Sequence, residues 1–269
     1  MPNLAAHAIA PRASTSSAVE ALFMYECERD EPHVLIPRPE VHLSVRFGPS
    51  ARGGLDAHAL GGRERVHRKV LSAGQRTLMA RLRLGAPEAV LGVPASEIAG
   101  RVVALEDLWG SAATRRFLDR LAQARELVDA AAIVESEVAE RLAVADARRP
   151  QSLLALGAAQ RLAMEKANVN AVAVDLGVSE RHLRRLFRQA LGVSPKTFAK
   201  LTRFRRALRA ARSDNGASWA SIAALAGYYD QAHLIAEFRS IAGMTPGALL
   251  GELRAADATS PLLSISFRH

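Results

Sequence analysis

One short stretch, SERHLRRLFR at 179–188, spaces basic and imidazole side chains for contact with an anion. They are Arg181, His182, Arg184, Arg185 and Arg188. Residues three and four positions apart share one face of an α-helix. A guanidinium on that face can donate paired hydrogen bonds to a guanine edge or to a phosphate. The chemistry expected here is therefore recognition of a polyanion.

The surrounding residues predict the helices that would position this face. VNAVAVDL, at 169–176, carries its apolar residues on one side and ends at Gly177, whose backbone freedom suits a sharp turn. Ser179 is placed to cap a second helix. Within that helix, Leu183, Leu186 and Phe187 share a face and are expected in the core. A helix, a tight turn and a basic second helix are typical of a helix-turn-helix unit.

The same pattern returns near the end of the chain. FRQALGVSP, at 187–195, matches FRSIAGMTP, at 238–246, so the two segments are offset by 51 residues. The second copy has WASIAALA, Gly227 and a candidate cap at Asp230, with Leu234 and Phe238 expected in the core. Its outer face is expected to show fewer donors, and these residues are Gln231, His233, Ile235, Ala236, Glu237 and Arg239.

A helix predicted at 195–212 would join the two units. Ser194 and Pro195 suit its start, since serine caps helices and proline fits the first turn. Eighteen residues span about 27 Å, slightly less than the roughly 34 Å between successive major-groove segments. This length predicts that both units engage one face of DNA and that the DNA bends towards the protein.

Charge and composition limit the class of protein. The chain of 269 residues has a formal charge of +9, and residues 151–212 hold 13 Lys and Arg against 3 Asp and Glu. A basic field so localised indicates a polyanionic partner. No signal peptide or membrane-spanning run is recognisable, so a soluble, cytoplasmic protein without membrane contact is expected. The single cysteine, Cys27, can form neither an intrachain disulfide nor a cysteine-based zinc site.

The first half predicts an α+β architecture followed by an all-α domain. Residues 1–20 are expected to form a flexible arm. Residues 21–110 contain alternating segments at 41–47, 65–71 and 76–84, which indicate a small antiparallel sheet or barrel. Short helices are expected after Gly85, each closed by a glycine.

Residues 111–150 are expected to be a helical connector or dimerisation region. Ser111 is a candidate cap for one or two helices that reach about Ala145. An apolar stripe there could pack on the protein's own sheet or form a dimer seam; its members are Leu127, Ala131, Val134, Val138 and Ala145. A linker is expected at 148–150. The double helix-turn-helix domain is expected at 151–255, beginning with a lead-in helix at 152–167 and a helix cap at Asn168. A tail is expected at 256–269.

Candidate ligand sites in the first half are few. Four histidines lie in its strand region, and either a metal site or ordinary surface histidines could explain them: His33, His42, His58 and His67. The segment GRERVHRK supplies Arg63, Arg65, Arg68 and Lys69, which could hold an anionic effector or form a solvated strand face. No catalytic motif is present, so no catalytic residue, metal or cofactor is expected.

Residues 153–253 resemble the AraC/XylS family of bacterial transcription regulators, through LGVSERHLRRLFRQALGVSPKTFAKLTRFRRALRAA and SIAALAGYYDQAHLIAEFRSIAGMTP. The resemblance implies two helix-turn-helix units on double-stranded promoter DNA, RNA polymerase as a partner, and control by a small molecule or by homodimer formation. By position, Arg181, His182, Arg184 and Arg185 fall in the base-reading slots of the first unit. Those of the second are Gln231, Ala232, His233 and Ala236, of which two are alanines. LMARLRLGAPEAVLGVPASEIAGRVVALEDLWG also resembles a sensor domain, of undefined function, that accompanies this family. This resemblance implies a sensor or regulatory role for residues 21–110.

Three hypotheses follow from these patterns. The first is a DNA-binding transcription regulator modulated through residues 21–110. The second is a regulator whose first half is only a scaffold, which predicts a closed core there. The third is a metal-dependent enzyme that acts on a small molecule, in which the basic half serves only to tether the enzyme to DNA.

Overall fold

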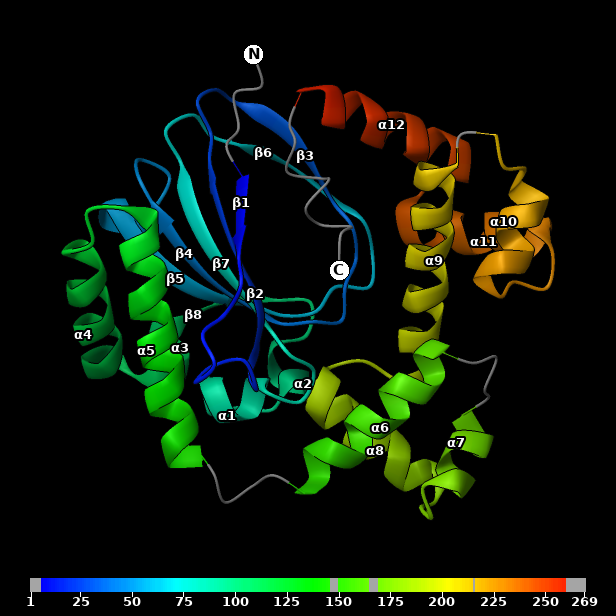
Figure 1. Cartoon of the computed structure of the whole chain (residues 1–269), viewed down its shortest axis with the longest axis horizontal. Coiled ribbons are helices and arrows are strands. Elements are labelled where there is room, and N and C mark those ends of the chain that lie inside the picture. The colour runs from blue at the N-terminus through cyan, green and yellow to red at the C-terminus, as the bar shows by residue number, and fades with distance from the viewer. Residues whose placement is uncertain (1–5, 146–149, 165–168, 215, 260–269) are drawn as a thin grey trace.

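The chain folds into a β-rich half and a helical half that lie side by side (Figure 1). The computed structural model describes residues 6–145, 150–164, 169–214 and 216–259. Its α+β architecture, antiparallel sheet first and helices after, confirms the fold class predicted from the sequence. Among the described helices, none has the length and the hydropathy needed to cross a bilayer.

Six antiparallel strands form the main sheet, in the order β1-β2-β7-β4-β5-β8. They are β1 (Ala6–Ile9), β2 (Val19–Glu26), β4 (His42–Phe47), β5 (Leu55–Leu60), β7 (Arg76–Leu82) and β8 (Val102–Ala104). A second sheet pairs only β3 (Glu31–Leu35) with β6 (His67–Leu71), and we call it the β3–β6 ribbon. A short 3-10 turn, Arg52–Gly54, precedes β5. The strands predicted at 41–47, 65–71 and 76–84 correspond to β4, β6 and β7.

The N-terminal segment differs from the flexible arm expected for residues 1–20. Residues 6–9 form β1, which pairs with β2 from Ala6 opposite Tyr25 to Ile9 opposite Leu22. Thr15 is fully buried, and its hydroxyl donates to Glu135 Oε1 at 2.9 Å. The prediction is therefore wrong for residues 6–20, because backbone pairing at the sheet edge and a buried carboxylate order a stretch with little apolar pattern. Residues 1–5 lie outside the described part.

Five helices follow the sheet in the first half. They are α1 (Pro87–Leu91), α2 (Ala95–Ile98), α3 (Leu105–Trp109), α4 (Ser111–Ala122) and α5 (Leu127–Ala145). Ser111 is the first residue of α4 rather than its cap, since Gly110 occupies the cap position and no side chain bonds there. In α5, Ala131, Val134 and Val138 are buried in the same core as the sheet. Of the two alternatives for this stripe, packing on the protein's own sheet is the one observed.

The second half contains seven helices within the described residues. They are α6 (Pro150–Met164), α7 (Val169–Asp175), α8 (Glu180–Leu191), α9 (Pro195–Ser213), α10 (Trp219–Ala226), α11 (Gln231–Ala242) and α12 (Pro246–Thr259). Residues 148, 149 and 168, and with them most of the expected linker and the Asn168 cap, lie outside the described residues. The tail expected from 256 overlaps the last turn of α12, where Ala256 is buried.

Two separate cores support the two helix-turn-helix units. In the first core, the rings of Phe187 and Phe198 pack edge to face with their centroids 5.4 Å apart. In the second core, the ring centroids of Phe204 and Phe238 lie 4.5 Å apart. The second core also includes Val34 of β3 and Ile36, the residue after that strand. The β-rich half therefore contributes directly to the packing of the second unit.

Candidate nucleic-acid interface

The first recognition helix, α8, is held by the local interactions that its sequence predicts. Ser179 Oγ accepts a hydrogen bond from the His182 N–H at 3.2 Å, and Gly177 takes a positive φ of 66° in the turn. Leu183, Leu186 and Phe187 are buried, as expected. The opposite face of the helix is thereby directed outward.

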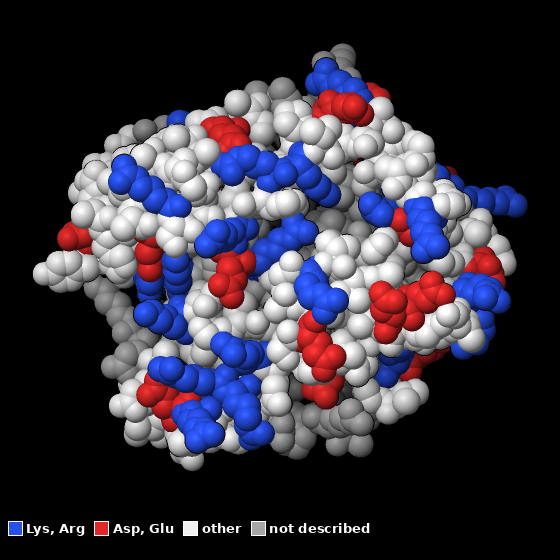
Figure 2. Space-filling model, turned by 180° about the vertical axis from the view of Figure 1, so that it is seen from behind, with Lys and Arg blue, Asp and Glu red and all other residues white. Residues whose placement is uncertain are grey.

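The outward face of α8 carries an unbroken set of donors. Arg181, Arg184, Arg185 and Arg188 are exposed, and His182 is half-buried. Arg184 Nε donates to Glu180 Oε1 at 3.0 Å, while Arg185 Nη2 lies 3.2 Å from His182 Nδ1. Neighbours on the same helix thus hold two of the four arginines. In the view from behind, Lys and Arg side chains gather over the end of the molecule that contains α8 (Figure 2).

The second recognition helix, α11, has the same cap and a poorer outer face. Asp230 Oδ1 accepts from the His233 N–H at 2.7 Å, and Leu234 and Phe238 are buried. Gln231, His233 and Arg239 are exposed, as predicted.

Glu237 does not belong to the outer face of α11. Its side chain is 12% exposed and accepts a hydrogen bond from Arg203 Nη2 of α9 at 2.6 Å. His233 Nε2 lies 3.4 Å from the same carboxylate. Helical periodicity predicts that Glu237 lies on the outer face of α11. It carries no information about Arg203, which is 34 residues away in the sequence and binds the Glu237 carboxylate.

The helix α9 joins the units as expected and begins at the predicted residue. Ser194 Oγ accepts from the Thr197 N–H at 3.1 Å, with Pro195 in the first turn. The helix has 19 residues, which corresponds to about 28 Å at 1.5 Å each. Its ion pair with Glu237 and the contact of Phe204 with Phe238 fasten the second unit to its C-terminal part.

One residue of this surface was missed from the sequence. Tyr229, in the turn before α11, is 92% exposed. An exposed aromatic ring beside a recognition helix can pack against sugar or base, and its phenol can donate to phosphate. Two consecutive tyrosines between the turn glycine and the cap residue were the available signal.

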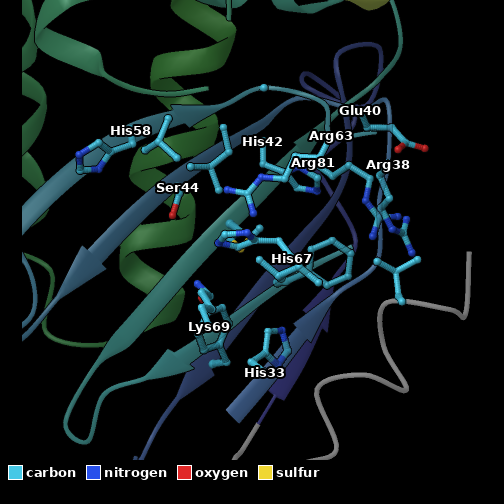
Figure 3. Close-up of a pocket in the computed structure, with 18 of the residues that line it drawn as sticks. His33, Arg38, Glu40, His42, Ser44, His58, Arg63, His67, Lys69 and Arg81 are labelled. Carbon is cyan, nitrogen blue, oxygen red and sulfur yellow. The ribbon is translucent and has the colours of Figure 1, made fainter. Parts of the chain in front are cut away.

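The β-rich half encloses a cavity of about 380 Å³ between the main sheet and the β3–β6 ribbon (Figure 3). All four strand-region histidines line it, three of them half-buried and the fourth, His67, exposed: His33, His42, His58 and His67. Arg63 and Lys69 line it too, whereas Arg68 pairs outside with Glu252 of α12 at 2.6 Å and Arg65 is exposed. Within the described residues, no group of three or more His, Cys, Asp or Glu is arranged to hold a metal.

Electrostatics in the cavity disfavour additional positive charge. Burial, followed by the charge of Arg81, lowers the pKa of His42 to about 3, and burial with Lys69 lowers that of His33 to about 4. Burial alone would raise the pKa of Glu40, but the charges of Arg205 and Arg38 outweigh it and lower this pKa to about 2. His42 and His33 are therefore neutral near pH 7 and Glu40 is ionised.

Two capped recognition helices on a shared connector define a double helix-turn-helix DNA-binding protein. Residues 155–252 match a family model described as a helix-turn-helix domain. This part of the chain is the AraC-type double helix-turn-helix domain, and the protein is a DNA-binding transcription regulator. A comparison with curated proteins found no match.

Several solved structures match this chain at low identity. A DNA-binding transcriptional dual regulator from Escherichia coli K-12 is 23% identical over 39% of this chain and 95% of its own, with a TM-score of 0.32. ToxT from Vibrio cholerae strain SCE256, with a bound unsaturated fatty acid, is 7% identical over 85% of this chain and 94% of its own, with a TM-score of 0.44. ToxT from Vibrio cholerae O395 is 8% identical over 93% of this chain and 98% of its own, with a TM-score of 0.39.

Proposed function

We propose that the protein is a sequence-specific regulator whose two units read successive major-groove segments of one promoter site. The observation that carries this proposal is the pair of capped, outward-facing helices α8 and α11 on the single connector α9. The residues proposed to contact DNA are Arg181, His182, Arg184, Arg185 and Arg188 in the first unit, and Gln231, His233 and Arg239 in the second.

The two units contribute unequally. The exposed face of α8 presents four arginines, each able to bind a guanine edge or a phosphate. At the corresponding face of α11, Ala232 and Ala236 have no side-chain hydrogen bond to offer. The first unit therefore supplies most of the direct base reading, and the second relies more on phosphate contacts and on the shape of the DNA.

The connector sets the geometry of the complex. Its length of about 28 Å is shorter than the roughly 34 Å between major-groove segments one turn apart. Simultaneous insertion of both recognition helices therefore requires the DNA to curve towards the protein. Bending of this kind costs a few kcal/mol, which the additional contacts offset.

A small molecule in the cavity is the proposed means of control. The scaffold alternative predicted a closed core in residues 21–110, and the cavity of about 380 Å³ favours sensing instead. Val34 and Ile36 line this cavity and also pack in the core of the second unit. The Val66 N–H donates to the Ile241 carbonyl at 2.9 Å, next to the ribbon. A ligand that shifts Val34 or Ile36 in the cavity wall can thus change the orientation of α11.

Two further partners are proposed on the family resemblance. RNA polymerase is the expected target of a regulator bound at a promoter. Formation of a homodimer is a second route to control. Because the α5 stripe is buried against the sheet, such a dimer would use another surface.

Genome-wide capture of DNA fragments with the purified full chain tests the proposal. We expect one enriched asymmetric motif whose two conserved blocks are separated by about one helical turn. Binding to that motif should weaken steeply with salt, because each arginine–phosphate contact releases a counterion. Equal binding to random DNA at every salt concentration would overturn sequence-specific recognition. An unbent site in a complex with both helices inserted would overturn the geometry alone.

A further inference from the structure

The cavity of the β-rich half combines an apolar wall with a concentration of positive charge. Apolar side chains from several strands line it, including Phe23, Leu35, Leu60, Met79 and Val102. The charged residues at its wall are Arg38, Arg46, Arg63, Lys69 and Arg81 against Glu40. Figure 3 shows side chains that extend toward one space from the main sheet (His42, His58 and Arg81) and from the ribbon (His33, His67 and Lys69).

Some of this charge is compensated within the protein. Arg46 is bound by Asp56 through two hydrogen bonds of 2.6 and 2.8 Å. Glu40 Oε1 accepts from Arg205 of α9 at 3.1 Å. Asp56 and Glu40 thus pair with Arg46 and Arg205, and no ion pair among the described residues joins either carboxylate to Arg63, Lys69 or Arg81.

Three cations of the cavity wall are poorly compensated. No described carboxylate pairs with Arg63 or Lys69. Arg81 is 3% exposed, its nearest carboxylate is Glu20 at 3.8 Å, and its Nε has no hydrogen-bond partner. The ring of Phe23, 4.6 Å from the Arg81 guanidinium carbon, holds that group in place. Burial of such charges is costly unless an anion joins them.

The protonation states of neighbouring groups agree with this need. Burial, followed by the charge of Arg63, lowers the pKa of Lys69. Burial and Arg81 lower that of His42 to about 3. Both shifts show that the cavity disfavours positive charge. His42 is neutral near pH 7, while the arginines remain charged. An occupant with two or more negative charges would relieve all three cations together.

We propose that the cavity binds a small organic molecule with a doubly charged acidic headgroup and an apolar body. The headgroup, a phosphate monoester or a pair of carboxylates, lies between Arg63, Lys69 and Arg81, where guanidinium groups can bind it bidentately. The body lies against Phe23, Leu60 and Met79. The inference specifies the chemistry of the effector in the proposed function and rests on that function only for the effect on DNA.

Calorimetric titration of the full chain with four probes of one size tests the headgroup. Phenyl phosphate and phthalate carry the two candidate headgroups, benzenesulfonate carries a single charge, and phenol carries none. At least one dianion should bind about tenfold more tightly than benzenesulfonate, and phenol should not bind, since each additional charge-assisted contact strengthens binding by about tenfold or more. Which dianion binds distinguishes phosphate from paired carboxylates. Equal affinity for phenol, or no binding of either dianion, overturns the inference.

Variants separate the headgroup site from a structural role. Arg63→Gln and Lys69→Gln should each weaken dianion binding about tenfold or more. Arg65→Gln, a substitution of an exposed arginine on the same segment, should leave the affinity unchanged. The midpoint of thermal unfolding without ligand should not fall in the Lys69 variant, because an uncompensated charge is removed. Unchanged dianion affinity in both cavity variants would overturn the inference.

DNA binding measured in the same samples keeps the two proposals distinguishable. If the protein binds its promoter site and no dianion, the effector chemistry is wrong and sequence-specific regulation stands. If a dianion binds and no DNA sequence is preferred, the cavity inference stands and the proposed function fails.

Discussion

Individual side chains on α8 are arranged so that their substitution tests recognition rather than folding. Arg184 and Arg185 are exposed, and their partners, Glu180 and His182, lie on the same helix. Exposed pairs of this kind contribute little to stability. Changes at these positions should therefore alter the affinity for DNA while leaving the fold intact.

Arg184→Ala and Arg185→Ala should each weaken binding to the promoter site by about 1–3 kcal/mol if the arginine reads a base. Fluorescence anisotropy with the captured site and with single base-pair variants of it measures this loss. A base-reading arginine loses discrimination at one position only. Uniform loss on all sequences would contradict base reading and would indicate a phosphate contact. Arg65→Ala, at an exposed arginine of the β-rich half, is the control.

Glu180→Gln should strengthen DNA binding several-fold, because it removes a negative charge near the phosphates and releases Arg184. The same substitution should cost about 0.3–1 kcal/mol of stability, since an acidic residue in the first turn favours the helix dipole. Anisotropy and thermal unfolding measure the two opposite effects. Glu64→Gln, which removes the same charge from an exposed residue outside the helices and strands, should change neither. Weaker DNA binding by Glu180→Gln would refute the prediction.

At the scale of elements, the repeat offers a matched pair of helix ends. Gly192 and Gly243 close α8 and α11 with φ values of 74° and 76°, and each N–H donates to a carbonyl of its own helix at 2.9 Å. Only the first end contacts the β-rich half: a Cβ on Gly192 would lie 2.9 Å from the Ala95 carbonyl oxygen of α2, while a Cβ on Gly243 would meet nothing. Comparison of the two positions isolates the contact between α2 and α8.

Gly192→Ala and Gly243→Ala should both destabilise the protein by about 1–2 kcal/mol, the cost of a left-handed backbone for a residue with a Cβ. Gly192→Ala should cost more, because α2 must also move. Urea unfolding of the two variants measures the difference. Equal decreases in the free energy of unfolding would show that α2 can move away from Gly192 at no energetic cost, which would contradict a firm contact between α2 and α8.

At the scale of the whole molecule, buried ionisable groups connect the halves and set the response to acid. Glu40, beside the cavity, bonds Arg205 of α9 at 3.1 Å. Its pKa falls from 4.5 to about 2, and that of His42 falls from 6.5 to about 3. In both cases the unfolded chain holds more protons than the folded chain at acidic pH. Stability is therefore fully present above the unfolded values and is lost as the pH falls.

The midpoint of thermal unfolding should decline as the pH drops below about 6.5, first through His42 and His33 and then, below about 4.5, through Glu40 as well. His42→Gln should flatten the upper part of this decline and leave the lower part. Differential scanning calorimetry between pH 7 and pH 3 measures both curves. A midpoint that stays constant from pH 7 to pH 4 would contradict the prediction.

Much of the helical half could be predicted from the sequence, because the signals there are local. Caps at Ser179, Ser194 and Asp230 act over three residues, and the buried faces around Phe187 and Phe238 follow the helical period. The repeat at an offset of 51 residues then identified both units together. Glu237 departs from this rule because Arg203, on another helix, decides its orientation.

The sequence by itself determined which arginine side chains at 181–188 share the outward face of α8, because the helical period and the cap at Ser179 decide this locally. Tertiary structure alone decided the rest. It ordered β1 through pairing and through the bond of Thr15 to Glu135, which is 120 residues away. It also brought histidines and arginines from separate strands into one cavity against the second unit. Such contacts depend on strand register and chain path, and these are settled only when the whole core packs.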